Sequence, residues 1–280
     1  MRNSGLLILF LGVTTAVSAQ NWYTVTELAP KTWLIDDNGA DNMYLVEGSK
    51  KALLIDTGLG AADLVATIQK ITDKPVIVVN THGHPDHSGA NYQFDKIYMY
   101  KADIEAAKMY SSVEQRKNAG EAMQGGHKPA DSELYKGEFK NPEYTAVSEG
   151  FEFDLGGRVI RVMETPGHTP GSICLLDVQN KMLFSGDTNN GLVWLFLQNC
   201  LPLSQYRKTL EKQVSRLAEF SVIYPGHGPA MDSSFIKDQL ECVKSILNGT
   251  CDSQPYESFA GNARICSFGN ASVAFNPENL

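Results

Sequence analysis

The sequence predicts an α/β domain with an αββα four-layer sandwich architecture, and three observations support this class. Short apolar runs of strand length alternate with stretches of helical periodicity. This order of elements occurs twice, once on each side of a polar stretch at 110–150. Each group of strands can turn one apolar face toward the other group and its second face toward helices, which gives two facing sheets between two helical layers.

The first half of the chain contains five apolar runs that are short enough to be strands. These predicted strands lie at 32–35, 42–46, 52–55, 74–80 and 97–100. Helices are predicted at 61–72, where apolar residues recur at helical spacing, and at 101–109. The polar stretch 110–150 is too long for an ordinary connection, so we expect a surface insertion or a lid. His127 lies in this stretch and is expected to be solvated.

The second half repeats the pattern with a Gly-Gly hairpin turn at 156–157 between its first two strands. Its predicted strands lie at 151–155, 159–164, 173–177, 181–185 and 221–224. Helices are predicted at 204–219 and 233–247, and a final hairpin at 263–267 and 271–275. We therefore expect one domain over residues 20–280, which ends in a helix and a hairpin.

Residues 1–19 have the features of a secretory signal peptide. Arg2 supplies a positive charge, Leu6–Val13 is apolar, and the small residues at 17–19 form a cleavage site. The apolar stretch is shorter than the roughly 20 residues that a transmembrane helix needs, so no stable membrane anchor is expected after cleavage. The sequence therefore predicts a secreted or periplasmic protein.

Charge and cysteine content exclude some classes of function. The chain has 24 basic and 32 acidic residues, a net charge of −8, which argues against nucleic acid as a partner. Its five cysteines include no C-x-x-C pair, which disfavours a thiolate zinc site. Export permits a disulfide but an odd count leaves a free thiol, and Cys174, in an apolar run, is expected in the core.

The segment 81–89, Thr-His-Gly-His-Pro-Asp-His-Ser-Gly, carries the densest set of metal-ligand side chains. It follows the predicted strand 74–80, at the strand end where open α/β sheets place their sites. Its glycines and proline predict a shaped loop rather than a helix. His82, His84, Asp86 and His87 are more ligands than one tetrahedral metal with an open position can take. Two neighbouring metal ions are the simplest interpretation.

Three further ligand-type residues lie in glycine-rich loops at the ends of other predicted strands. They are His168, Asp187 and His227. The full set can supply two divalent ions. His82, His84 and His168 are assigned to one ion, and Asp86, His87 and His227 to the other. Asp187 remains as a carboxylate that can bridge the two ions.

The pattern resembles the metallo-β-lactamase superfamily. The resemblance rests on His-x-His-x-Asp-His at 82–87, followed in the family's order by His168, Asp187 and His227, and on Asp56-Thr57-Gly58. It covers most of residues 30–230. The resemblance implies the αββα fold with a dinuclear site at the edge of its two sheets. Asp56 is expected to orient a ligand by hydrogen bonding rather than to bind metal.

An Asp at position 187 is similar to the bridging residue of glyoxalase II, lactonases, phosphodiesterases and RNase Z-type nucleases. Charge and export argue against a nuclease. We therefore predict an exported hydrolase that cleaves a carboxylic ester, thioester or lactone of small size. Two Zn²⁺ ions are expected, with iron or manganese as alternatives. A bridging hydroxide would attack the carbonyl carbon, and Asp86 is the candidate for proton transfer.

Three alternatives stay open at this point. The same site can hydrolyse β-lactams, or it can hold one iron ion, as in the sulfur dioxygenases of this superfamily. The third alternative is a secreted metal- or partner-binding module without catalysis. The apolar cluster at 192–197 is equally compatible with core packing and with a wall for an acyl chain. The exact substrate, the disulfide pairing and the oligomeric state are not readable from the sequence.

Overall fold

The computed structural model describes residues 22–112, 114–115 and 140–280. The predicted signal segment, residues 1–19, lies outside the described residues, as does His127. Within the part of the chain that the structure describes, no helix has both the length and the apolar character that crossing a bilayer requires. The prediction of export therefore rests on the sequence.

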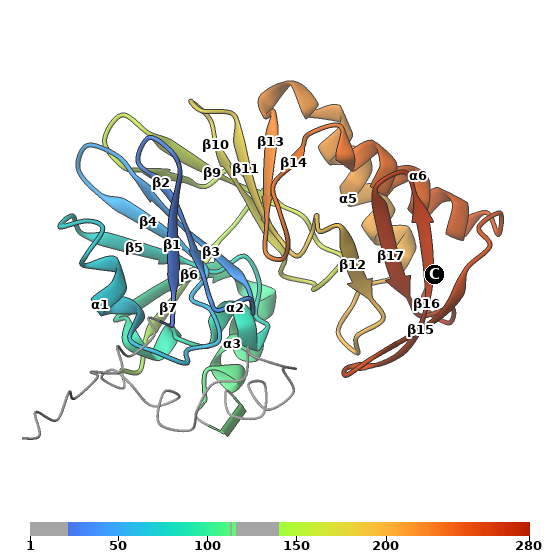
Figure 1. Cartoon of the computed structure of the whole chain (residues 1–280), viewed down its shortest axis with the longest axis horizontal. Helices are drawn as coiled ribbons and strands as arrows, with labels where there is room; N and C mark the ends of the chain where they lie inside the picture. The colour runs from blue at the N-terminus through green and yellow to red at the C-terminus, as the bar shows by residue number, and fades with distance from the viewer. Residues whose placement is uncertain (1–21, 113, 116–139) are drawn as a thin grey trace, which may run out of the picture.

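The first sheet contains seven strands arranged in sequence order. They are β1 (Thr24–Ala29), β2 (Thr32–Asp36), β3 (Asn42–Glu47), β4 (Ala52–Ile55), β5 (Val76–Val79), β6 (Lys96–Tyr100) and β7 (Glu143–Val147). Strands β1 to β4 pair antiparallel, whereas β4 to β7 pair in parallel (Figure 1). All residues of β3 and β4 are buried, because both faces of the sheet are covered.

Strand β7 lies within the stretch 110–150, for which the sequence predicted an insertion or a lid. It pairs in parallel with β6, and Val147 enters the core. This part of the stretch is therefore a strand of the first sheet. Four of its five residues are not buried, so it lacks the apolar run by which the other strands were recognised. Residues 113 and 116–139 lie outside the described residues, and the expectation of a lid stays a prediction there.

The second sheet contains six strands in the order β14-β13-β11-β10-β9-β8. They are β8 (Glu152–Asp154), β9 (Val159–Glu164), β10 (Ile173–Asp177), β11 (Met182–Gly186), β13 (Val222–Pro225) and β14 (Met231–Asp232). Strands β8 and β9 form the predicted hairpin, in which Gly156 and Gly157 both have positive φ angles, 88° and 78°. Strand β11 pairs in parallel with β13, so the loops that follow both strands lie at the same sheet edge.

The two sheets face each other across a shared apolar layer, which confirms the predicted sandwich. Side chains of β3 and β4 pack against those of β9, β10 and β11, and the rings of Tyr44 and Phe184 lie 5.0 Å apart. A second cluster covers the outer face of the first sheet and includes Leu64 and Ile68 of α1 (Leu64–Ile68). Helix α1 is shorter than the helix predicted at 61–72.

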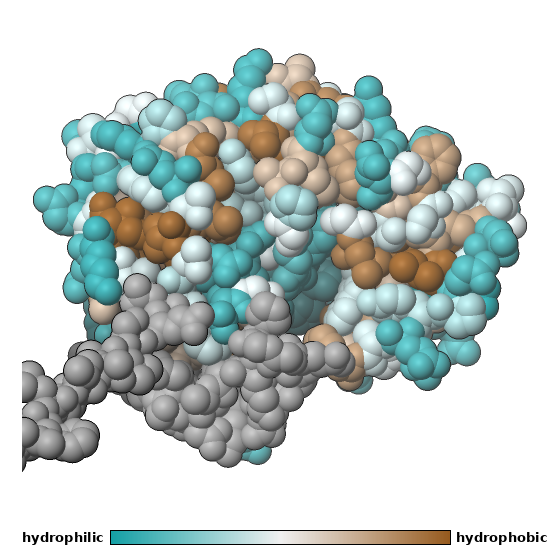
Figure 2. Space-filling model, in the orientation of Figure 1, coloured by the Kyte–Doolittle hydropathy of each residue, from teal (hydrophilic) through white to brown (hydrophobic). Residues whose placement is uncertain are grey.

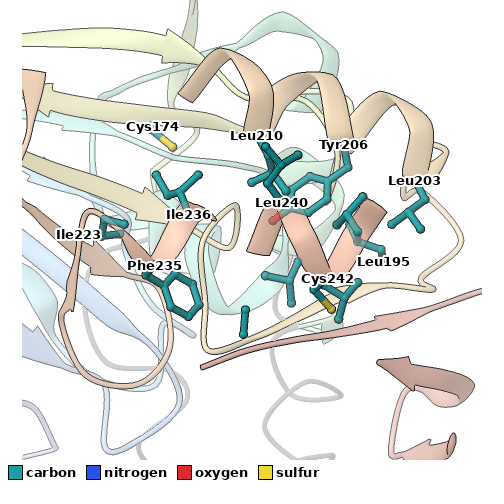
Figure 3. Close-up of a cluster of buried hydrophobic side chains, with 14 of the residues drawn as sticks. Cys174, Leu195, Leu203, Tyr206, Leu210, Ile223, Phe235, Ile236, Leu240 and Cys242 are labelled. Atoms are coloured by element: carbon teal, nitrogen blue, oxygen red, sulfur yellow. The ribbon is translucent and has the colours of Figure 1, made fainter. Parts of the chain in front are cut away.

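Helices α5 (Leu203–Ser215) and α6 (Phe235–Leu247) cover the outer face of the second sheet. Figure 3 shows Tyr206 and Leu210 of α5 packed beside Ile236 and Leu240 of α6. The other helical segments that lie wholly within the described ranges are one-turn α2 (Pro85–Ser88), α3 (Ile104–Tyr110), η1 (Asn91–Gln93), η2 (Lys101–Asp103) and η4 (Leu217–Glu219). The resulting order is helix, sheet, sheet, helix.

A third sheet lies outside this four-layer arrangement and was not predicted as a sheet. Its order is β12-β17-β16-β15, with β12 (Leu192–Leu195), β15 (Gln254–Ser258), β16 (Gly261–Phe268) and β17 (Ala271–Phe275). The predicted hairpin corresponds to β16 and β17, and β12 joins it by parallel pairing with β17. The sheet shares an apolar cluster with α5 and α6, so these helices have a sheet on each side.

The cysteines divide between this third sheet and the core. A disulfide joins Cys251, just before β15, to Cys266 on β16. The other three cysteines, Cys174, Cys200 and Cys242, are free thiols and are buried. Cys174 is fully buried in the cluster under α5, as predicted. The disulfide therefore constrains the part of the chain that follows α6 rather than the sandwich.

Candidate metal centre

The segment that follows β5 contains a helical turn, where the sequence predicted a loop without helix. Helix α2 begins at Pro85, which occupies its first position and has no N–H to leave unpaired. The backbone N–H groups of His87 and Ser88 donate to the carbonyl oxygen of His84 at 3.1 and 3.0 Å. The turn separates Asp86 and His87 from His82 and His84 and directs them to a second group of ligands.

Three imidazoles from both halves of the chain form the first group. Nε2 of His82 lies 3.1 Å from Nδ1 of His84, and Nε2 of His168 lies 2.9 Å from the same atom. All three residues are buried. Three ring nitrogens that converge at this spacing form the donor set of a tetrahedral metal ion with one open position.

Each ring of this first group has a hydrogen-bond partner on its other nitrogen. The hydroxyl of Thr81 lies 3.1 Å from Nδ1 of His82, and the side-chain amide of Asn199 lies within 3.3 Å of Nε2 of His84. Nδ1 of His168 donates to the backbone carbonyl of Trp194 at 2.8 Å. Such partners fix ring orientation and leave the converging nitrogen free to bind metal.

Asp86, His87 and His227 form the second group. Nε2 of His227 lies 3.4 Å from Oδ2 of Asp86, and Nε2 of His87 lies 3.9 Å from it. Asp56 has the role that the sequence suggested. Its Oδ2 lies 3.0 Å from Nδ1 of His87, and its two oxygens accept hydrogen bonds from the backbone and hydroxyl of Thr81 at 2.7 Å. Asp56 thereby orients one ring of each group.

Asp187 lies between the two groups. Its carboxylate oxygens lie 3.4 Å from ring nitrogens of His87, His168 and His227. This position requires a glycine at 226, because a Cβ there would lie 2.4 Å from Oδ1 of Asp187 and 2.7 Å from the ring of His87. The structure thus brings all seven predicted ligands together in one site.

Burial and neighbouring charge give the two groups different protonation. Burial, together with the nearby His168, lowers the pKa of His84 to about 4. Burial also lowers the pKa of His82, with His87 as the next contribution. The rings of His82 and His84 are therefore neutral near pH 7, which is the form that binds metal.

In the second group, charge outweighs burial. Burial disfavours the carboxylate of Asp187, but His227 and His87 together hold its pKa well below the usual range. Burial disfavours the charged form of His87 and His227, but the nearby carboxylate of Asp187 outweighs it and raises the pKa of both rings. Ionic contacts of Asp187 with His87 and His227 therefore hold this group together.

Two buried polar atoms show that the site fits a cation. Nε2 of His87 and Oδ1 of Asp187 are buried and lie 3.4 Å apart as an ion pair, and neither has a hydrogen-bond partner among the described residues. A bound cation would give both atoms a partner. Among the residues that the structure describes, the possible donor sets, each with ligand atoms within 4.8 Å of one another, are His82-His84-His168, His82-His87-Asp187 and Asp86-His87-His227.

Asp103 has a positioning function that the sequence did not reveal. Its Oδ2 accepts hydrogen bonds from the backbone of Gly83 at 3.0 Å and the hydroxyl of Thr169 at 2.6 Å, and its Oδ1 accepts from the backbone of Gly171 at 2.8 Å. The residue thus joins the loop of His82 and His84 to the loop of His168. A single Asp at the start of a predicted helix carries no motif that would identify this role, and Asn199 is equally inconspicuous.

The site opens into a cavity of about 1400 Å³. Ligand residues of both groups form one side of it, including His84, Asp86 and His227. Trp194 of β12, Tyr256 of β15 and the β15–β16 turn form the other side. In Figure 2 the surface recedes between the body that holds the first sheet and the C-terminal strands. A small molecule in this cavity can reach the candidate metal centre and the third sheet at once.

Comparison with known proteins identifies the family. The family model described as Metallo-beta-lactamase superfamily matches residues 36–227. This match spans more than half of the chain and contains every predicted ligand, so the chain belongs to the metallo-β-lactamase superfamily. It is accordingly a metal-dependent hydrolase.

Its relatives include thioesterases and hydrolases. The chain is 30% identical to the acyl-coenzyme A thioesterase MBLAC2 of Bos taurus over 235 residues, which cover 75% of this chain and 83% of that protein. It is 25% identical to the probable metallo-hydrolase M6_Spy0554 of Streptococcus pyogenes, with 75% and 87% covered.

Solved structures share the fold. A metallo-β-lactamase from Pontibacter korlensis superposes with a TM-score of 0.57 and 20% identity, covering 79% of this chain and 99% of that one. The sec-alkylsulfatase Pisa1 from Pseudomonas sp. superposes with a TM-score of 0.64 and 18% identity, covering 81% and 42%. At these identities the likeness supports the fold and leaves the reaction undecided.

Proposed function

We propose that this protein is an exported hydrolase of acyl thioesters that uses two divalent metal ions. The observation that carries the proposal is the position of Asp187, within 3.4 Å of ring nitrogens from both ligand groups at the end of one large cavity. The acyl-coenzyme A thioesterase relatives support a thioester among the ester-like substrates that such a site accepts.

Two ions fit the seven ligands as follows. His82, His84 and His168 would hold the first ion, and Asp86, His87 and His227 the second. Asp187 would be shared. Imidazole and carboxylate ligands suit zinc, and iron and manganese accept the same donors. When bound, such ions polarise a carbonyl group and lower the pKa of water to around 7.

In this proposal, the side chains of the site position the substrate carbonyl beside the seven ligand residues, and one of them accepts a proton. Asp86 is the candidate proton acceptor, because its carboxylate is partly open to the cavity while Oδ2 lies 3.4 Å from Nε2 of His227. Asn199 and the carbonyl of Trp194 keep the rings of His84 and His168 in fixed orientations. Fixed orientation matters because small misplacements of catalytic groups cost large factors in rate.

A thioester suits this site better than an ester with an alcohol leaving group. A thiol has a pKa near 8.5, so it departs as a thiolate with little need for a proton. The carboxylates that line the cavity near the ligands, Asp86 and Asp187, are ionised when they bind metal, so a proton becomes available to a leaving group only after Asp86 has accepted one. An alcohol leaving group would depend on that proton more strongly than a thiol does.

A substrate panel tests the reaction. Purified protein is assayed with a thioester, an oxygen ester, a lactone and a cephalosporin, and its metal content is measured by mass spectrometry. We expect about two zinc ions per chain and the highest kcat/KM for the thioester. Preferential cleavage of the cephalosporin would establish β-lactam hydrolysis instead, and one iron per chain with oxygen uptake would establish oxidation.

Export is supported by the sequence of residues 1–19 and by the Cys251–Cys266 disulfide, since disulfides persist in oxidising compartments. The test is N-terminal sequencing of protein recovered outside the cytoplasm. We expect the chain to begin at Gln20. Recovery of a reduced, full-length chain from the cytoplasm would contradict the proposal.

A further inference from the structure

Four aromatic rings form a cluster on the side of the cavity to which the third sheet contributes. The Trp194 ring lies 5.2 Å from Phe196, 6.3 Å from Tyr256 and 5.4 Å from Phe259, between ring centroids. Trp194, Tyr256 and Phe259 line the cavity, and Phe196 packs beside them. We call these four residues the aromatic wall.

The aromatic wall is built by the third sheet, from segments far apart in the sequence. Trp194 lies on β12, Tyr256 on β15, and Phe259 in the turn between β15 and β16. The Cys251–Cys266 disulfide joins the start of this hairpin to its second strand. Trp194 and Phe196 lie within the residues that match the superfamily, 36–227, whereas Tyr256 and Phe259 lie beyond them.

Trp194 connects the wall to the metal centre. Its backbone carbonyl accepts the hydrogen bond from Nδ1 of His168, while its indole N–H donates to the hydroxyl of Tyr256 at 3.1 Å. The polar atoms of both rings are therefore paired with each other, and the ring faces are left for apolar contact. An apolar chain attached to a carbonyl group at the metal centre would therefore contact the wall.

The wall exposes apolar surface that a bound hydrocarbon would cover. Phe259 is 67% exposed and Met109, which lines the cavity from α3, is 51% exposed. Figure 2 shows hydrophobic surface over β12 and the C-terminal strands, beside the recess. Leu192, Leu197 and Phe235 extend the apolar lining on this side. Asp232 and Asp238 also lie on this side, so a phosphate-bearing group would be repelled there.

We propose that the aromatic wall binds the hydrocarbon chain of the substrate and selects long acyl groups. This assignment rests on the proposed thioesterase function and specifies which part of the substrate the third sheet recognises. The cavity, at about 1400 Å³, exceeds the 300–1,000 Å³ common for small-ligand sites. It therefore has room for an extended chain beyond the carbonyl group at the metal centre.

The first test is a chain-length series of acyl thioesters that share one thiol, from acetyl to dodecanoyl. Full burial of one methylene corresponds to a factor of roughly 4 in affinity. We expect kcat/KM to rise by at least tenfold from butanoyl to dodecanoyl, mainly through KM. Phe259→Ala should reduce this rise about fivefold, and Phe259→Leu should restore part of it.

The matched control is Phe268→Ala. Phe268 is also an exposed phenylalanine, 47% exposed, on β16 of the same sheet, but it does not line the cavity. This variant should keep the wild-type chain-length dependence. Thioester hydrolysis without chain-length preference, or equal effects of Phe259→Ala and Phe268→Ala, would overturn the assignment.

The second test separates the wall from the reaction. Binding of a fluorescent polyunsaturated fatty acid is titrated with the wild-type protein, Phe259→Ala and Phe268→Ala. Saturable binding that only Phe259→Ala weakens supports the wall, even if the protein hydrolyses no thioester, in which case the proposed function alone fails. Absence of binding to the wild-type protein, together with a flat chain-length series, overturns the wall and leaves the thioesterase proposal standing.

Discussion

The two sides of the cavity are constructed in opposite ways. On the metal side, ligands lie on short loops at strand ends of two facing sheets, and the rings of His82, His84, His87 and His168 each have an orienting partner. On the side of the aromatic wall, large side chains from a separate sheet are partly exposed and contact one another in tilted and edge-to-face arrangements. The first side is suited to fixed geometry, and the second to apolar groups of varying length.

This difference predicts how substitutions act. A change on the metal side alters the bond-breaking step, so it should lower kcat for every substrate by a similar factor. A change in the aromatic wall alters binding of one part of the substrate, so its effect should grow with chain length. Kinetic measurements can therefore assign a residue to one side without further structural information.

The largest effect is expected for His84→Ala, which removes a ligand of the first group. We expect at least a 10³-fold loss of kcat for short and long thioesters alike, equivalent to about 4 kcal/mol. Bound metal should fall in parallel, as measured by mass spectrometry of the purified variant. Full activity of this variant in metal-depleted buffer would refute metal-dependent catalysis at this site.

An intermediate effect is expected for Asp103→Ala, because Asp103 joins the loop of His82 and His84 to the loop of His168. Substitution of residues that orient metal ligands typically costs 10- to 100-fold in metal affinity or activity. We expect a loss in this range that excess zinc partly reverses, measured as kcat against zinc concentration. Asp103→Asn keeps one acceptor oxygen and should lie between the wild type and Asp103→Ala.

If excess zinc restores nothing to Asp103→Ala while circular dichroism shows a folded protein, Asp103 does not act through metal affinity. This outcome would weaken the comparison between the two sides of the cavity, since a residue of the metal side would then act without affecting metal binding.

The smallest effect on activity is expected from removal of the disulfide by a paired Cys251→Ser and Cys266→Ser substitution. The disulfide closes a loop with a sequence separation of 15, which corresponds to about 3 kcal/mol in the chain-entropy model. We expect a lower melting temperature and a two- to threefold loss for dodecanoyl thioester. A uniform loss across chain lengths would show that the third sheet also supports the metal side.

The grouping of the seven candidate ligands could be predicted from the sequence, because their residue types and their positions at strand ends are distinctive. Four ligands lie within 82–87, and each of the others follows a strand in a glycine-rich loop. The helical turn α2 was missed, because Pro85 and its neighbouring glycines were interpreted as signs of a loop, although proline favours the first position of a helix.

The third sheet could not be predicted, because its decisive pairing joins β12 to β17 across some 80 residues of sequence. Strand β15 is also missed, since none of its residues is buried and it carries no apolar run. The stretch 192–197 illustrates the limit well. Val193 and Leu195 are core residues, while Trp194 lines the cavity. The sequence left open whether this stretch packs in the core or forms an apolar wall, and alternate side chains of the strand do one or the other.

Trp194 joins the two sides through different atoms, and this has a practical consequence for redesign of the enzyme. The oxygen that orients His168 belongs to the main chain and is retained by every amino acid at this position. A library of substitutions at 194 can therefore reshape substrate preference while the imidazole keeps its anchor. Engineers seeking new acyl selectivity should begin there rather than at any residue whose side chain touches the ligands.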